Sequence, residues 1–87
     1  MSDATVKAGD LFVHEYADGG LMVYDRSGFS EFRMKEGYVF TVLELDVHDG
    51  FDAKYLKVLM SNTGKVHYVL ERDFDGWLSR EYLKKLG

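Results

Sequence analysis

The chain is patterned as short runs of apolar and β-branched residues separated by turns that contain glycine or aspartate. Runs of this length and composition predict β-strands, and glycine supplies the backbone conformations that tight turns need. Six strands are expected, at residues 11–16, 21–24, 29–34, 38–47, 53–60 and 65–71. The first two are joined by ADGG and are expected to pair as a hairpin.

The longest strand candidate is YVFTVLELDV, residues 38–47, because a helix of this composition would expose apolar side chains on every side. Residues 53–60 and 65–71, joined by SNTG, predict a second hairpin. Its expected inward sets are Leu56, Val58 and Met60 opposite Val66, Tyr68 and Leu70. The other interior residues expected are Leu11, Val13, Val39 and Leu43.

Two interpretations of the C-terminal stretch DGWLSREYL stay open. In one, Trp77 and Leu78 form a short last strand and Ser79 begins a single helical turn; in the other, a longer helix runs from about Ser79 to Leu86. The last strand is accordingly either residues 66–70 or residues 77–79. We favour a strand that closes a small β-barrel, with Trp77 packed at the seam, followed by a short capping helix that leaves Tyr82 partly exposed.

The length of 87 residues allows one domain, expected at residues 11–87 after an N-terminal arm at residues 1–10. A hydrophobic content of 46% and the absence of proline argue against disorder. The absence of cysteine excludes a disulfide scaffold, a thiolate nucleophile and a cysteine zinc site. No apolar run approaches the ~20 residues that span a bilayer, and MSDATVKAGD lacks a signal-peptide core, so a cytoplasmic protein is expected.

The chain is acidic, with 15 acidic and 11 basic residues and a formal net charge of −4. Binding to duplex nucleic acid usually requires a basic stripe that meets the phosphates. The charge therefore disfavours nucleic acid as the partner.

The order of these elements resembles the Src-homology-three fold, in particular its bacterial branch. FRMKEGYVFTVLE is similar to the family's strand, lysine-containing turn and long strand; AKYLKVLMSNTGKVHYVLERDF is similar to its later hairpin and the short helical turn that follows; DGWLSREYLKKL is similar to the end of bacterial members. The resemblance covers roughly residues 11–83 and implies an all-β, five- to six-stranded barrel with a short C-terminal helix. It does not imply the family's polyproline ligand, because Lys54 and Tyr55 stand where the tandem tryptophan is typical and Leu70 and Glu71 stand near the place of the groove proline.

Aromatic residues make up 15% of the chain, more than a small barrel readily encloses together with its aliphatic residues. Tyrosine and tryptophan are enriched at interface hot spots, so we expect an aromatic patch that binds a protein partner or a second copy of the chain. The residues expected to form it are Tyr38, Phe40, Tyr55, Trp77 and Tyr82. Acidic loops are expected to tune the partner's approach through Asp46, Asp49, Asp52, Asp73 and Asp75.

Catalytic and metal-binding signals are weak. The acidic and histidine residues around His48 lack calcium-loop spacing and predict a solvated hairpin loop, so neither a metal nor a cofactor is expected. His14 and His67 alternate with apolar residues in strands and are expected on the barrel surface, with no spacing that supports a catalytic triad. The sequence thus favours a non-enzymatic protein-interaction module. The alternatives are a small acidic inhibitor of a nucleic-acid-handling protein, of the kind that phages and mobile elements encode, and a nucleic-acid-binding barrel.

Overall fold

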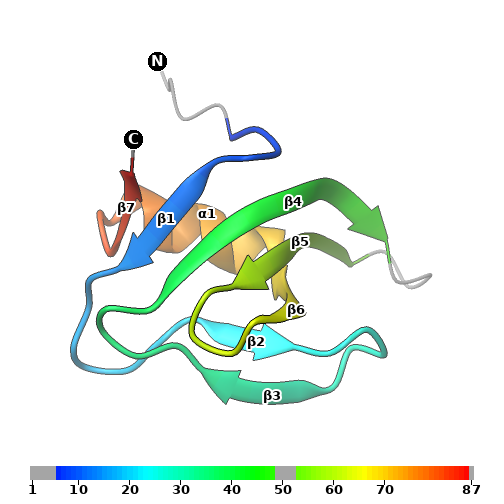
Figure 1. Cartoon of the computed structure of the whole chain (residues 1–87), viewed down its shortest axis with the longest axis horizontal. Coiled ribbons are helices and arrows are strands. Elements are labelled where there is room, and N and C mark those ends of the chain that lie inside the picture. The colour runs from blue at the N-terminus through cyan, green and yellow to red at the C-terminus, as the bar shows by residue number, and fades with distance from the viewer. Residues whose placement is uncertain (1–5, 49–52, 87) are drawn as a thin grey trace.

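The structure, a computed structural model, describes residues 6–48 and 53–86, which form a seven-stranded antiparallel sheet and one short helix (Figure 1). The elements are β1 (Leu11–His14), β2 (Met22–Tyr24), β3 (Ser30–Arg33), β4 (Val39–His48), β5 (Lys54–Met60), β6 (Lys65–Leu70), α1 (Glu71–Ser79) and β7 (Leu83–Leu86). The strand order is β3-β2-β6-β5-β4-β1-β7. The sheet is not closed, so β3 and β7 are its two edges.

The expectation of a mostly-β domain with one short helix is confirmed, and each of the six expected strands has a counterpart within a residue or two. The described residues nevertheless form seven strands rather than five or six, in an open sheet rather than a closed barrel. The additional strand is β7, which pairs with β1 at the C-terminal end of the chain.

The prediction that the first two strands pair as a hairpin is wrong. β1 pairs with β4 and β7, whereas β2 pairs with β3 and β6. The ADGG segment therefore connects two distant parts of the sheet. Turn residues such as ADGG predict that the chain changes direction, but they do not determine which strands pair. Here the pairing of β1 with β4 buries Phe12 against its cross-strand partner Phe40.

The core lies between the inner face of the curved sheet and α1. Its buried hydrophobic residues are Phe12, Leu21, Val23, Met34, Phe40, Val42, Leu56, Val58, Met60, Val69, Phe74 and Leu83. The ring of Phe12 stacks on Phe40 at 5.8 Å between centroids and meets the edge of Phe74 at 5.2 Å. Phe74 is the one buried residue of α1, which runs behind β1 and β4 in Figure 1, and the half-buried Trp77 and Leu78 of this helix pack against the same core.

The inward face was predicted correctly for β5 and wrongly for β6. Leu56, Val58 and Met60 are buried as expected, but His67 and Val69 face inward from β6 while Val66 is exposed. The register explains this, because His67 lies opposite Val58 and Val69 opposite Leu56, and directly opposed residues share a face. Among the other residues expected inside, Leu11 and Leu43 are exposed and Val13 and Val39 are only half-buried.

The C-terminal stretch differs from both of its expected forms. Residues 77–79 belong to α1, Ser79 ends this helix instead of capping a new one, and Leu83–Leu86 is a strand. The chain leaves the helix through Glu81 at a φ of 65°, while the N–H of Tyr82 donates to the carbonyl of Trp77. Burial of Leu83 opposite His14 on β1 outweighs the local helix signals of the lysines that follow.

The last residues before β1 are tied to the sheet. Gly9 N–H donates to the carbonyl of Val42, whose own N–H donates to the carbonyl of Asp10. The Asp10 carboxylate also lies 3.4 Å from the Lys85 ammonium on β7. The part of the expected N-terminal arm that the structure describes is therefore joined to β4 and β7.

His14 is fully buried, contrary to the surface position expected for it. Its Nε2 accepts the N–H of Leu21 at 3.4 Å, its ring lies 5.0 Å from that of Trp77, and its Nδ1 has no hydrogen-bond partner among the described residues. Burial disfavours the charged imidazolium and lowers the pKa of His14, and the carboxylate of Glu36 offsets part of this shift.

Acidification is expected to destabilise the fold through His14. Below its ordinary pKa of about 6.5 the unfolded chain binds a proton at this residue that the folded chain does not, so stability falls as the pH drops from about 6.5 through the lowered pKa. Thermal melts at pH values of about 7.5 and 5.5 should show a larger loss of Tm for the wild type than for His14→Phe, because other titrating groups are common to both. Equal losses would contradict the assignment.

Candidate protein-binding surface

The five aromatic residues selected from the sequence do not form one patch. Phe40 is fully buried in the core, so its place in a binding surface was predicted wrongly. Tyr38 lies beside Phe32 of β3, with ring centroids 6.4 Å apart. Tyr55 is only 8% exposed and faces a different part of the molecule from Trp77 and Tyr82, which lie together near the end of α1.

Trp77 and Tyr82 form an aromatic cluster with Tyr16. The rings of Tyr16 and Tyr82 stack at 4.0 Å, and Trp77 meets them edge-on at 5.4 Å and 5.0 Å. All three are half-buried, and the N–H of Glu15 donates to the carbonyl of Tyr82. These contacts join the segment after β1 to the end of α1 and the start of β7, which gives the cluster a structural role.

The second aromatic group, around Tyr55, lines a pocket of about 390 Å³ that we call the tyrosine pocket. It is lined by Asp25, Arg26, Gly28, Glu44, Val47, His48, Tyr55, Lys57 and Tyr68. Tyr24 adjoins it, since its ring meets that of Tyr55 edge-on at 5.8 Å and its backbone pairs with Tyr68. The volume lies within the range of about 300–1,000 Å³ typical of ligand pockets.

The pocket forms where the long strand β4 departs from regular pairing. Its register against β5 shifts between Val42 and Glu44 and again between Glu44 and Val47, and Asp46 has a φ of 55°. Bulges of this kind bend a strand and increase its twist. The bent end of the β4–β5 pair supplies one wall of the pocket and the turn after β2 supplies the other.

Charge in the tyrosine pocket is balanced. Asp25 and Glu44 contribute two carboxylates, and Arg26 and Lys57 contribute two basic groups. Glu44 and Lys57 are cross-strand partners on the outward face of the sheet. The surface is therefore locally neutral although the whole chain carries a formal charge of −4.

A rigid turn beside this pocket holds the most exposed large hydrophobic residue of the described chain, Phe29, which is 72% exposed. The Asp25 carboxylate accepts the N–H groups of Ser27 and Phe29 at 2.8 and 3.0 Å, and the N–H of Asp25 donates to the carbonyl of Phe29 at 2.9 Å. Gly28 closes the turn at a φ of 89°, which a side chain would disfavour. The ring of Phe29 is thus presented on a fixed backbone.

Phe29 and the basic side chain of Arg26 were not selected from the sequence. Phe29 is the first residue of the strand expected at residues 29–34. The available signal was the DRSG turn, because an aspartate followed by serine and glycine predicts a closed turn that leaves the next side chain at a loop tip.

The acidic residues expected in loops are placed differently. Asp46 is exposed at the irregular part of β4, whereas Asp73 and Asp75 lie in α1 and not in a loop. Asp49 and Asp52 lie outside the described residues. Within residues 6–48 and 53–86, no group of three or more histidine, aspartate or glutamate side chains is arranged to hold a metal ion.

His67, also expected on the surface, is buried and joins β3 to the turn between β5 and β6. Its Nδ1 lies 2.5 Å from the Glu31 carboxylate, and its Nε2 lies 2.9 Å from the Thr63 hydroxyl. The Thr63 oxygen also accepts the N–H of Lys65 at 3.1 Å, as a turn-closing threonine does. The carboxylate, imidazole and hydroxyl follow the order of a catalytic triad, but each contact connects elements of the sheet and its turn, and we assign them a structural role.

The chain matches no protein-family model, and no curated protein or solved structure is significantly similar to it. No helix in the described part of the chain is long and apolar enough to cross a membrane. The function is therefore inferred from the surface itself.

Proposed function

We propose that the protein is a non-enzymatic protein-interaction module that binds its partner through the pocket face, defined as the tyrosine pocket together with Phe29. The observation that carries this proposal is the 72% exposure of Phe29 on a hydrogen-bonded turn beside the pocket. Exposing an aromatic ring to water is unfavourable in the free protein, and a turn whose backbone is already fixed loses less conformational entropy on binding than a flexible loop. Aromatic anchors of this kind dominate the energetics of many protein interfaces.

The neutral pocket favours a protein partner over nucleic acid. A site for single-stranded nucleic acid combines stacking aromatic residues with a basic groove, whereas Asp25 and Glu44 would face the phosphates here. The outward-facing Leu59 and Val66, both exposed, extend the apolar surface along β5 and β6 from Lys57 and Tyr68. We retain the Src-homology-three type of barrel as the proposed relationship of this open sheet, supported by the order of its strands and by the helix directly after β6, and the cytoplasm as the proposed location.

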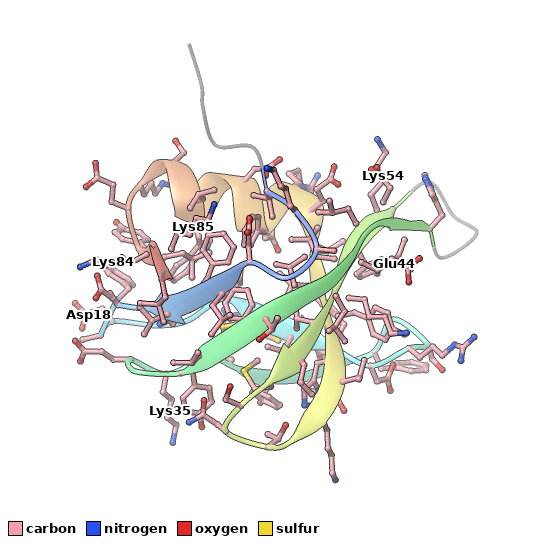
Figure 2. All side chains as sticks on the ribbon, turned by 45° about the horizontal axis from the view of Figure 1, so that its top comes forward. Asp18, Lys35, Glu44, Lys54, Lys84 and Lys85 are labelled. Atoms are coloured by element: carbon pink, nitrogen blue, oxygen red, sulfur yellow. The ribbon has the colours of Figure 1, made fainter. Side chains whose placement is uncertain are left out.

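Replacing Phe29 with alanine is expected to weaken partner binding roughly 30- to 1,000-fold while leaving the fold intact, because loss of a hot-spot side chain typically costs an interface about 2–4 kcal/mol. The immobilised chain would be incubated with lysate of the encoding organism, and retained proteins would be identified, produced separately and titrated by calorimetry. Leu86→Ala is the matched control, since this exposed leucine lies on β7. Figure 2 shows β7, with Lys84 and Lys85, at the opposite end of the molecule from Glu44. A partner bound equally well by Phe29→Ala would overturn the assignment of this surface.

A further inference from the structure

The pocket face carries a protruding side chain and a cavity next to each other. Phe29 follows Gly28, which lines the tyrosine pocket, and the Phe29 ring is exposed instead of filling that pocket. An interface formed around a two-fold axis uses the same patch on both copies. Each contact between two different residues therefore forms twice, once in each direction. A projecting ring beside a cavity that can hold it has this self-complementary form.

The charges of the pocket face are also self-complementary. Two carboxylates, from Asp25 and Glu44, and two basic groups, from Arg26 and Lys57, line the same cavity. In the proposed arrangement, the acidic groups of one copy lie opposite the basic groups of the other, as both kinds line the same cavity. Two chains of net charge −4 repel each other in general, and a locally neutral face is the surface through which they can approach.

From these observations we infer that the partner of the pocket face is a second copy of this chain, and that each copy inserts Phe29 into the tyrosine pocket of the other. This inference rests on the proposed function, because it names the partner of the same surface. Since the ring and the cavity are neighbours on one face, the exchange closes at two copies and does not propagate into a chain.

The dimer is expected to be reversible. A stable interface of standard size buries about 800 Å² on each partner. The total accessible surface of the monomer is 5540 Å², so such an interface would occupy roughly one seventh of it. The tyrosine pocket supplies part of that area and the outward-facing Leu59 and Val66 extend it. An interface at the small end of the range gives a mass that depends on concentration.

Sedimentation velocity of the full chain tests the inference, with loading from roughly 1 μM to 500 μM to cover weak association. The wild type should shift from monomer to dimer, and Phe29→Ala should stay monomeric over the same range. Val47→Trp, which places an indole in the pocket wall, should also stay monomeric. An equimolar mixture of the two variants should form a heterodimer weaker than the wild-type dimer. In it, Phe29 of the Val47→Trp chain enters the open pocket of the Phe29→Ala chain, and the second exchange is missing.

Several results would overturn the inference. These are a monomeric wild type at every concentration, a dimer that persists in Phe29→Ala, a species larger than a dimer, and a mixture that stays monomeric although both variants fold by circular dichroism. Leu86→Ala should dimerise as the wild type does. Should Val47→Trp fail to fold, a photo-crosslinking benzoylphenylalanine at position 29 provides an independent measurement. Crosslinks in the dimer band should map to Lys57 or Tyr68 of the other copy, and crosslinks confined to other residues would contradict the exchange.

The failure of this inference can be distinguished from that of the proposed function. A wild type that stays monomeric but captures a different protein in a Phe29-dependent manner would leave the proposed function standing and exclude the second copy as partner. If neither the solution mass of the chain nor its capture of a partner depends on Phe29, the proposed function and the inference of a second copy as partner are both wrong.

Discussion

Replacing Phe74 with alanine is expected to destabilise the fold by about 3–5 kcal/mol, the usual cost of truncating a fully buried phenylalanine. Phe74 is 1% exposed and its ring contacts those of Phe12 and Phe40 edge-on. The cavity would open between α1 and the inner face of the sheet, where this side chain alone of the helix is buried. For a domain of 60–100 residues such a loss lowers Tm by roughly 12–40 °C; thermal melts would measure this shift and urea titration the loss of stability.

Phe29→Ala is the matched control for this experiment. It removes the same atoms from a side chain that is 72% exposed, and surface substitutions usually change stability by less than about 0.5 kcal/mol. Similar losses for the two variants would show that the ring of Phe74 does not anchor α1. The same control establishes that Phe29→Ala is folded in the binding and association experiments.

The positions of the strands could be predicted because they depend on local chemistry. Alternating apolar residues end at aspartate- and glycine-containing turns, and the resulting boundaries agree with the structure within a residue or two for the first six strands. Pairing could not be predicted in the same way. β1 lies between β4 and β7, which come from distant parts of the chain, and only burial of its inward side chains selects these neighbours.

Which face of a strand points inward was ambiguous wherever both faces carry apolar residues. In β6, Val66, Tyr68 and Leu70 form a more apolar set than Lys65, His67 and Val69, yet His67 and Val69 face the core, while Lys65 at the start of the strand is exposed. His67 is accommodated there because Glu31 and Thr63 satisfy its two ring nitrogens. A buried polar side chain with partners from two other elements leaves no local trace in the sequence.

The sequence allowed the prediction that aromatic side chains lie outside the core, but not which residues they are. An excess of aromatic residues correctly indicated that some ring lies outside the core, and Tyr55 does line the tyrosine pocket. Among the described residues the most exposed ring is that of Phe29, whereas Phe40 occupies the core although both belong to strand-like runs. Their difference arises from the turn that Asp25 closes and from the packing of Phe40 on Phe12, and the second of these is a tertiary contact.

Position 20 requires glycine because two backbone segments approach each other closely there. A Cβ atom at this position would lie 1.8 Å from the carbonyl oxygen of Met34 and 2.8 Å from its carbonyl carbon. Met34 cannot move away freely, because its N–H donates to the carbonyl of Leu21 and its side chain is buried. Arg33 also donates to the carbonyl of Gly20 at 3.1 Å. Any side chain at position 20 must therefore separate the segment before β2 from the segment after β3.

Gly20→Ala is accordingly expected to destabilise the fold by about 3 kcal/mol or more, at the upper end of what overpacking costs, and to lower Tm by roughly 12 °C or more. Gly76→Ala provides the opposite case within the same chain. There the added methyl group meets only the Arg80 guanidinium at 3.8 Å, and alanine in a helix is favoured over glycine by about 0.5–1 kcal/mol. Thermal melts should show opposite changes for the same substitution at the two positions. A Gly20→Ala protein as stable as the wild type would mean that β2 and β3 can separate at this point without loss of the core.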